Sequence, residues 1–326
     1  MKETVLLTGA AGFIGSHVAE KLLRSGYRVV GLDNFDDYYD PAIKRENIRG
    51  LTGNPAWRIV LGDIRDKKLM EGVFSTNQID MVIHLAARAG VRPSLELPAL
   101  YQSINIGGTI NVLEQCHQNG VKRVLLASSS SVYGEDTRVP FREDMNVDSP
   151  ASPYAASKVG AELFCRTYSN LYNLSIGALR FFTVYGPRQR PEMAIHLFTR
   201  KIENDEEITI FGDGTSKRDY TFIDDIVDGI LRALASRTPG FEVYNLGNSQ
   251  PIALNYLIQL LEENLGKEAM IRRLPPQPGD VPITFADVSK ATDLLGYRPQ
   301  TPIEEGIPRF VQWFRKSDSK RSLLKA

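Results

Sequence analysis

Two kinds of apolar pattern alternate along the first half of the chain. Short, nearly continuous apolar runs predict buried strands, and segments with apolar residues three or four positions apart predict amphipathic helices. We expect strands at 5–8, 28–32, 57–61, 80–85, 121–127 and 175–182. Helical patterns lie between them, most clearly at 16–25, 101–119 and 154–172. This alternation predicts an α/β fold with a doubly wound parallel sheet, which binds ligands at the carboxyl ends of its strands.

The pattern changes after Gly186-Pro187, where Pro and Gly become more frequent and the apolar runs become shorter. Frequent Pro and Gly indicate turns and loops, so the second half has less regular structure than the first. The run 208–211 predicts a short strand, and we expect the run 241–246 to return to the main sheet. We therefore predict a large first domain and a smaller substrate-holding region after it.

A glycine-rich turn follows the first predicted strand and precedes a predicted helix, with the sequence Gly9-Ala10-Ala11-Gly12-Phe13-Ile14-Gly15. Glycines in this setting let the backbone approach a pyrophosphate, which then lies at the helix N-terminus. The next strand ends in Asp33, where a carboxylate can accept hydrogen bonds from ribose hydroxyls and repels a 2′-phosphate. The motif alone is common by chance, but in this setting it predicts a Rossmann-type site for NAD rather than NADP.

Tyr154 and Lys158 are four residues apart, which places them on one face of a helix. An ammonium group beside a phenol favours the phenolate and lowers the phenol pKa from its usual value of about 10. Tyr154 is therefore a candidate base for redox chemistry on an alcohol. Taken alone, the pair is equally well explained as a surface pair on a helix.

Composition limits the classes of partner. The 326-residue chain has 39 Lys+Arg and 39 Asp+Glu, so its net charge is zero. A neutral chain gives no electrostatic reason to expect nucleic acid or an anionic membrane as a partner. No apolar run is long enough to span a bilayer, and the N-terminus enters a strand without a leader-like segment, so we expect a cytoplasmic protein. Cys116 and Cys165 follow no metal or redox spacing, which favours buried free thiols, and we expect no metal site.

Further short motifs follow one another over nearly the whole chain: Gly62-Asp63, His84-Leu85-Ala86-Ala87, Ser128-Ser129-Ser130-Ser131-Val132-Tyr133-Gly134, Arg180-Phe181-Phe182 and Lys217-Arg218-Asp219-Tyr220. In this order, with the glycine turn and the Tyr-Lys pair, they resemble the extended short-chain dehydrogenase/reductase family, and within it the nucleotide-sugar epimerases. The resemblance implies an NAD-binding Rossmann domain at 1–186, with parts of 220–250. It also implies a nucleotide-sugar-binding region at 187–326.

The resemblance assigns the catalytic work to Ser129, Tyr154 and Lys158. Ser129 helps to position the sugar 4-hydroxyl, and Tyr154 takes its proton while the C4 hydride moves to NAD. Lys158 holds the nicotinamide ribose and, with the positive charge of the cofactor, lowers the pKa of Tyr154. The 4-keto sugar then turns over and takes the hydride back on its other face, so NAD is regenerated and stays bound.

The cofactor contacts that the resemblance implies begin in the glycine turn and continue at the strand ends. Asp63 and Ile64 are expected to flank the adenine. The whole expected set is Gly9, Gly12, Phe13, Ile14, Gly15, Asp33, Asn34, Asp63, Ile64, Leu85, Ala86, Ala87 and Asn105, together with Tyr154 and Lys158.

The serine run discriminates among the reactions of the family. Sugar 4,6-dehydratases carry Thr-Asp-Glu where this chain has Ser129-Ser130-Ser131, because elimination of water needs an acid and a base near C5 and C6. Related decarboxylases tend to carry an acidic residue at the position of Ser131. Both reactions are therefore disfavoured. A relative that only binds the dinucleotide usually lacks the Tyr or the Lys, and replacement of Tyr154 by Phe would separate that class from an enzyme.

The nucleotide end of the substrate is matched in part. Arg218 stands at the family position that binds the diphosphate, where a guanidinium forms paired hydrogen bonds. Asp280 matches a residue that holds the nucleotide ribose. Galactose-type epimerases tend to have an Arg where this chain has Pro278, so the second cation for the diphosphate must be Arg190, Arg92 or another residue.

The sugar end favours an acidic sugar. Segments 33–41, 89–92 and 183–187, the last followed by Arg190, look like the corresponding parts of UDP-glucuronate 4-epimerases. Galactose-type enzymes usually carry Asn in place of Thr183, and a C6 carboxylate needs a hydroxyl or backbone N–H with a nearby cation. Thr183 and Arg190 could supply these, with Ser129, Ser130 and Ser131 as further sugar contacts. We predict a UDP-glucuronate/UDP-galacturonate 4-epimerase with bound NAD.

Two alternatives stay open. The turn Pro187-Arg188-Gln189-Arg190-Pro191 departs from the glucuronate pattern, which keeps a UDP-glucose/UDP-galactose 4-epimerase in consideration. Thr284 is small at a position that limits bulk at C2, so N-acetylated sugars are also possible substrates. Members of the family commonly dimerise through helices that correspond to 101–119 and 154–172, and we expect a homodimer with a four-helix interface.

Overall fold

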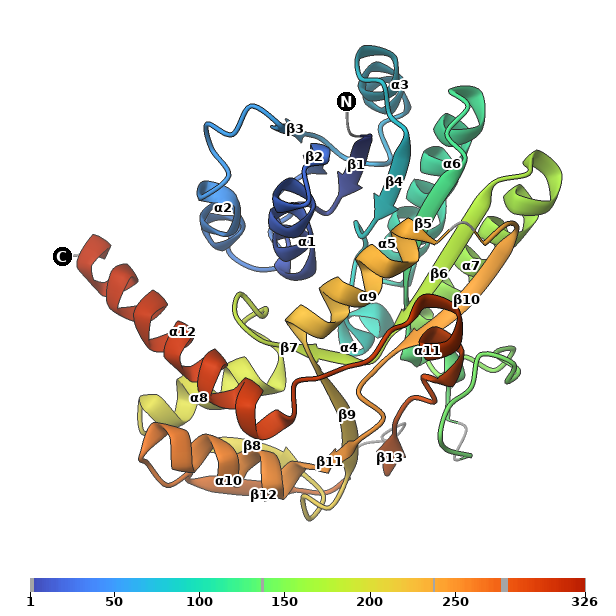
Figure 1. Ribbon diagram of the computed structural model, residues 1–326. Coiled ribbons are helices and arrows are strands. Elements are labelled where there is room, and N and C mark those ends of the chain that lie inside the picture. Colours follow the sequence, from blue (N-terminus) through green and yellow to red (C-terminus); the bar gives the residue numbers. More distant parts are fainter. Residues whose placement is uncertain (1–2, 136–137, 237, 277–280, 326) are drawn as a thin grey trace.

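The computed structural model describes residues 3–135, 138–236, 238–276 and 281–325, with side chains up to residue 317. Its largest element is a seven-stranded parallel sheet with the order β10-β6-β5-β4-β1-β2-β3 (Figure 1). The chain winds from β1 outward to β3, then returns to β4 on the other side of β1. The predicted doubly wound fold is confirmed, and its reversal point lies between β1 and β4. The strands are β1 (Thr4–Thr8), β2 (Arg28–Asp33), β3 (Trp57–Leu61), β4 (Met81–His84), β5 (Arg123–Ser129), β6 (Ser175–Phe181) and β10 (Phe241–Leu246).

Both faces of the sheet are covered, which explains why its central strands are apolar at nearly every position. Successive residues of β1 point to opposite faces. Val5 and Leu7 belong to a core shared with α1 (Phe13–Arg24) and α9 (Ile223–Ala235). Leu6 belongs to the opposite core, shared with α3 (Lys67–Thr76), α6 (Thr109–Gln118) and α7 (Pro153–Tyr172). Because β1 is buried on both sides, its carboxyl end is fixed at the centre of the molecule.

Two helix starts fix the positions of predicted site residues. Helix α1 begins at Phe13, directly after the glycine turn, and no side chain caps it. Helix α7 begins at Pro153 and is capped by Ser152, whose hydroxyl accepts a hydrogen bond from the backbone N–H of Ala155 at 3.1 Å. Proline at the first helical position and serine at the cap are both favourable there. The cap therefore places Tyr154 in the first turn of α7.

The helix expected at 101–119 is not uniform. Its first part is a π-helical segment, η1 (Gln102–Gly108), which follows the short α5 (Pro98–Tyr101) and leads into α6. A π-helical turn is wider than an α-helical turn, and such segments occur frequently at functional sites. The buried Asn105 lies in this segment, so the wider turn sets where its amide points.

The second half of the chain forms two small sheets and a helical layer. The strands β7 (Thr183–Tyr185), β9 (Lys217–Phe222), β11 (Pro251–Ala253) and β13 (Ile283–Thr284) form one sheet, and β8 (Ile208–Phe211) pairs with β12 (Ile271–Leu274). The chain leaves the main sheet at Phe181 and enters the smaller sheet at Thr183. Strand β10 returns to the main sheet beside β6, as the sequence predicted. Figure 1 shows α8 (Ala194–Glu203), α10 (Leu254–Leu265) and α12 (Ile303–Lys325) below the main sheet.

The pair Asp224-Asp225, which precedes the apolar run from Ile226, does not cap a helix. Helix α9 begins earlier, at Ile223, without a side-chain cap. Asp224 instead forms an ion pair with Arg309 of α12, and Asp225 accepts hydrogen bonds from the backbone N–H groups of Gln300 and Thr301. Both carboxylates therefore attach the C-terminal segment to the main domain. The remaining helices are α2 (Pro41–Arg49), α4 (Val91–Glu96), α11 (Ser289–Leu295) and the 3₁₀ turn η2 (Ser130–Tyr133).

Candidate active site

A cleft of about 380 Å³ lies at the carboxyl ends of β1, β2, β4 and β5, beside the reversal point of the main sheet. Its size is in the range of small-molecule sites. It brings together predicted residues from eight separate stretches of sequence: Gly9, Gly12, Phe13, Ile14, Gly15, Asp33, Asn34, Asp63, Ile64, Leu85, Ala86, Ala87, Ser129, Ser130, Ser131, Tyr154, Lys158, Thr183 and Arg190.

Two glycines of the turn, Gly9 and Gly15, have no room for a side chain. Gly9 has φ +69°, and a Cβ atom on it would lie 2.8 Å from the backbone nitrogen of Ala86. A Cβ atom on Gly15 would lie 2.0 Å from the carbonyl oxygen of Gly9. The first turn of α1 has no acidic residue, so its unpaired N–H groups give the cleft a positive end. The turn therefore fits the pyrophosphate of a dinucleotide.

Asp33 is buried and rigidly held at the end of β2. One carboxylate oxygen accepts from the backbone N–H of Ala11 at 2.9 Å, and the other accepts from the backbone N–H of Phe35 at 2.8 Å. A carboxylate oxygen can accept two hydrogen bonds, so each oxygen has capacity for a ribose hydroxyl. The fixed carboxylate fits an unphosphorylated ribose, as the sequence predicted for NAD.

Asp63 and Asn34 form the neighbouring wall. The Asn34 amide donates to Asp63 at 3.1 Å, and Arg65 donates to both oxygens of Asp63 at 2.9 and 2.7 Å. The hydrogen bonds from Arg65 lower the pKa of Asp63, so this carboxylate is ionised at neutral pH. This wall is polar and lies next to the apolar Ile64.

The three predicted catalytic side chains meet where β5 ends and α7 begins. Ser129 is the last residue of β5 and forms a hydrogen bond with Tyr154 that lowers the pKa of the phenol. The Lys158 ammonium is buried, donates to the carbonyl of Ala127 at 2.7 Å, and lies 6.0 Å from the Tyr154 ring centroid. Burial lowers the Lys158 pKa to about 8, against the attraction of Glu162, so Lys158 is mainly a cation at pH 7.

Lys158 without the charge of the cofactor does not bring the pKa of Tyr154 below its usual value. The pKa of Tyr154 is raised, because burial penalises the phenolate more than the hydrogen bond from Ser129 and the charge of Arg190 favour it. Lys158 directs its ammonium to Ala127, and its own charge is weakened by burial. A low pKa at Tyr154 therefore needs a further positive charge in the cleft.

The predicted sugar contacts line the same cleft from the side of the small sheet. Thr183 begins β7 and is paired in register with Tyr220 of β9. Arg190 forms an ion pair with Glu192 at 3.1 Å, and its guanidinium lies 5.8 Å from the Tyr38 ring centroid. A cation and a hydroxyl therefore lie in the cleft that holds Ser129 and Tyr154.

Four predicted residues are not brought into this cleft by the described part of the chain. Arg92 is exposed and lies 4.9 Å from the Phe211 ring centroid, and Arg218 donates to the carbonyl of Lys217. Asn105 directs its amide to the backbone of Arg88 and to Ser157, so it supports the wall from behind. Asp280 lies outside the described residues, as does Pro278.

A polar cluster forms around Tyr38, in the loop after β2, and two of its members, Arg88 and Lys44, were assigned no role by the sequence. Tyr38 lies between two guanidinium groups, with Arg88 at 4.5 Å and Arg190 at 5.8 Å from its ring centroid. Arg88 also forms an ion pair with Asp36, and Lys44 donates to the carbonyl of Asp36 at 2.7 Å. Asp36 and Tyr38 lie in segment 33–41, which the sequence had already matched to UDP-glucuronate 4-epimerases, and the signal for Arg88 was its place just after a strand end.

His84 is a structural residue, as its position in an apolar strand suggested. Its two ring nitrogens form hydrogen bonds with Thr8 at 2.7 Å and Thr109 at 3.1 Å. Burial lowers its pKa to about 3, so the ring is neutral. Cys116 and Cys165 are buried and free, as expected. Among the described residues there is no group of ligands suited to a metal ion and no helix long and apolar enough to cross a membrane.

The fold and the cleft define a Rossmann-type dinucleotide enzyme with a Ser-Tyr-Lys group. A profile of the NAD dependent epimerase/dehydratase family matches residues 5–247, and the chain belongs to this family. It is similar to a UDP-glucuronate 4-epimerase of Thermodesulfobacterium geofontis, at 46% identity over 96% of both chains.

Solved structures give the same picture. The UDP-glucuronic acid 4-epimerase of Bacillus cereus, in complex with UDP-glucuronic acid and NAD, superposes with a TM-score of 0.91 at 38% identity, covering 96% of this chain and 99% of the other. The UDP-glucose 4-epimerase of Thermotoga maritima, with UDP-glucose, has a TM-score of 0.88 at 35% identity with the same coverage.

Proposed function

We propose that the protein is an NAD-dependent 4-epimerase that interconverts UDP-glucuronate and UDP-galacturonate. The observation that carries this proposal is the presence of Thr183 and Arg190 in one cleft with Ser129, Tyr154 and Lys158. The first two residues suit a sugar carboxylate, and the other three suit oxidation and reduction at a sugar hydroxyl.

The chain supplies binding and proton transfer. When bound, NAD supplies a nicotinamide that accepts a hydride from C4 of the sugar and returns it. The glycine turn holds the pyrophosphate through backbone N–H groups, and Asp33 holds the adenosine ribose. Lys158 contributes a cation within the cleft. The remaining predicted contacts, Asn34, Asp63, Ile64, Leu85, Ala86 and Ala87, form the walls.

Tyr154 moves the proton. It accepts the proton of the sugar 4-hydroxyl when C4 is oxidised, and it returns this proton when the ketone is reduced from the opposite face. Ser129 is hydrogen-bonded to Tyr154 and so fixes the direction of the phenol oxygen. Because burial raises the pKa of Tyr154 in spite of the charge of Arg190, the reaction requires further positive charge in the cleft, which the bound cofactor would supply.

The sugar carboxylate is assigned to Thr183 and Arg190, with Ser130 and Ser131 as further hydroxyl donors in the cleft. The guanidinium of Arg190 already pairs with a carboxylate, that of Glu192 at 3.1 Å, so its position suits an anionic group. A second candidate, a UDP-glucose/UDP-galactose 4-epimerase, is favoured by the similarity to the Thermotoga maritima enzyme. Both candidate reactions use the same catalytic group, and their sugars differ only at C6, which is a carboxylate in one and a hydroxymethyl group in the other.

The nucleotide end belongs to the smaller region in this proposal. We assign 1–186, with parts of 220–250, to NAD and 187–326 to the UDP-sugar. Arg218, Arg92 and Asp280 remain candidates for the diphosphate and the ribose. Arg92 and Arg218 carry cationic side chains, and neither belongs to the walls of the cleft.

The quaternary structure and the location are also proposals. Helix α7 exposes Leu163 at 58%, Phe164 at 38% and Leu171 at 67%, on one side of the helix. Exposed apolar patches of this kind mark protein interfaces, which supports a homodimer through α7 and the neighbouring 101–119 segment. Light scattering at micromolar concentration tests this, and a monomer would contradict it. The cytoplasmic location expected from the sequence stays a prediction, which cell fractionation tests.

The first experiment is an NMR assay of the purified protein with UDP-glucuronate and UDP-glucose in separate tubes and no added NAD. Conversion of UDP-glucuronate alone supports the proposal and the carboxylate contacts. Conversion of UDP-glucose alone contradicts it and makes the second candidate correct.

A further inference from the structure

Arg190 lies in the middle of an unusual connection, residues 186–193, between β7 and α8. The connection begins with Gly186, at φ +139°, and contains Arg188 at φ +67°, a left-handed conformation that a non-glycine residue rarely adopts. Such a conformation persists only where the surroundings enforce it. The direction of the Arg190 side chain therefore depends on whatever holds residues 186–190 in place.

One set of contacts comes from α1, the helix that follows the glycine turn. The Nε2 atom of His17 is 2.9 Å from the carbonyl oxygen of Pro187, so the ring N–H donates to it. Glu20, one turn further along α1, forms an ion pair with Arg188. Burial lowers the pKa of His17 to about 4, and the ring is neutral with its proton available for this hydrogen bond.

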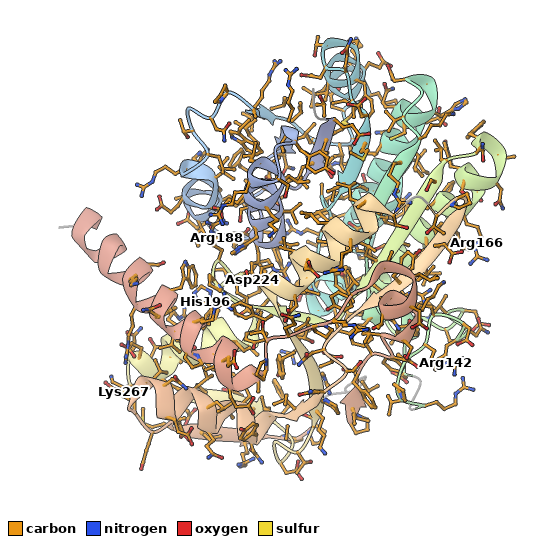
Figure 2. All side chains as sticks on the ribbon, in the orientation of Figure 1. Arg142, Arg166, Arg188, His196, Asp224 and Lys267 are labelled. Atoms are coloured by element: carbon orange, nitrogen blue, oxygen red, sulfur yellow. The ribbon has the colours of Figure 1, made fainter. Side chains whose placement is uncertain are left out.

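A second set comes from the opposite side, from α8 and α12. The Nδ1 atom of His196 donates to the carbonyl of Gln189 at 2.7 Å. The His196 ring is enclosed by the rings of Phe310, Trp313 and Phe314, with centroid distances of 5.9, 5.8 and 5.4 Å. Figure 2 labels Arg188, beside α1, and His196, against α12. Two carbonyl groups of the connection thus accept hydrogen bonds from histidines on opposite sides.

We infer that His17 and His196 are positioning residues for Arg190. By fixing the carbonyls of Pro187 and Gln189, they prevent two peptide units from rotating: Pro187–Arg188, and Gln189–Arg190, which directly precedes Arg190. Arg190 then stays in the cleft, within 5.8 Å of the Tyr38 ring centroid. This inference rests on the proposed contact between Arg190 and the sugar, and it extends that contact to two residues that do not touch the substrate.

The inference also links the two halves of the site. His17 belongs to the helix whose N-terminus forms the glycine turn, and His196 belongs to the helix that follows the sugar-binding connection. The segment bearing Arg190 is therefore held by one element of each half. Loss of either hydrogen bond is expected to weaken sugar binding and leave the nucleotide contacts unchanged.

Matched variants separate the hydrogen bond from the volume of the ring. H196F retains an aromatic ring among Phe310, Trp313 and Phe314 but has no N–H, whereas H196N carries an N–H near the position of Nδ1. H17F and H17Q form the corresponding pair at the first histidine, since the Gln amide can replace Nε2. Each variant is purified with its bound NAD, and KM and kcat are measured for the UDP-sugar that the wild type converts. The Kd for UDP, which lacks the sugar, is measured by calorimetry.

H196F and H17F are each expected to raise KM about tenfold, which corresponds to the loss of one positioning contact, while kcat changes by less than about threefold. The Kd for UDP stays unchanged, and H196N and H17Q return KM to within about threefold of the wild type. In an R190M background, H196F produces no further rise in KM, because its effect acts through Arg190. H17F serves as the second test if H196F does not fold.

An equal rise in the Kd for UDP and in KM overturns the inference, because the histidines would then support the fold as a whole. Additive effects of H196F and R190M on KM also overturn it. Failure of the proposed function is seen separately. A wild type that converts UDP-glucose and not UDP-glucuronate refutes the proposal that UDP-glucuronate is the substrate. The same comparison of KM with the Kd for UDP is then made with UDP-glucose.

Discussion

The two halves of the cleft are built by different means. The cofactor half consists of a glycine turn, a helix N-terminus and side chains at strand ends, such as Asp33, so most of its contacts are backbone groups or lie next to one another in sequence. The half that we assign to the sugar consists of side chains from a short strand and from separate connections: Thr183, Arg190, Tyr38 and Arg88. A site built from backbone is fixed by the fold, whereas a site built from side chains depends on the contacts behind each of them.

Tyr154→Phe gives the largest effect that we expect, because it acts where the two halves meet. The substitution removes the proton acceptor and keeps the ring, so kcat falls about 10²–10⁴-fold while bound NAD is retained. Turnover by NMR and the nucleotide content of the purified protein measure the two quantities. Full activity in this variant would remove Tyr154 from the reaction.

Arg190→Met tests the sugar half. Loss of charged hydrogen bonds costs about 1.5–3 kcal/mol, so kcat/KM for UDP-glucuronate falls about ten- to a hundredfold. Activity toward UDP-glucose, which has no carboxylate, changes less. Arg142→Met is the matched control, because Arg142 is exposed, pairs with the Asp144 carboxylate at 3.0 Å and lies outside the cleft walls. An equal loss for both sugars would show that Arg190 binds the diphosphate and not the carboxylate.

Gly15→Ala tests the cofactor half. Its Cβ would lie 2.0 Å from the Gly9 carbonyl oxygen, so the turn must shift, and we expect a loss of about 1–3 kcal/mol in stability together with bound NAD. Gly72→Ala in α3 is the control, because nothing lies within 4 Å of the added carbon. Urea unfolding and nucleotide content decide the comparison. Normal NAD content in Gly15→Ala would show that the turn is more adaptable than its geometry implies.

Acid is expected to lower the stability of the protein through His84, which joins Thr8 to Thr109 behind the cofactor half. The pKa of His84 is about 3 in the folded protein and 6.5 in the unfolded chain. Between these values only the unfolded chain takes up the proton. The free energy of unfolding therefore decreases as the pH is lowered below 6.5. One such proton accounts for on the order of 1 kcal/mol between pH 6.5 and 5. His84→Asn is expected to be less stable at pH 7 but to lose less between those pH values. An unchanged pH dependence would contradict this assignment.

Much of the fold was predictable because its signals are local. The strands of the main sheet, the glycine turn and the cap before Tyr154 each depend on a few neighbouring residues. The return of the run at Phe241–Leu246 to the main sheet was also predictable, since an apolar run of that length must be buried. The π-helical segment at Gln102–Gly108 and the roles of Asp224 and Asp225 were not, because they depend on partners far away in sequence.

The sequence by itself determined the fold class, through its alternating apolar pattern, and the pairing of Tyr154 with Lys158, because spacing along one helix is enough to place them on one face. The order of its motifs indicated the family, and that resemblance added Ser129. Only the tertiary structure decided the pKa values in the site and the direction of the Arg190 side chain. Burial raises the pKa of Tyr154 in spite of Lys158, and the position of Arg190 depends on contacts with α1 and α8. Desolvation and contacts between distant segments arise only when the chain is folded, and no local pattern encodes them.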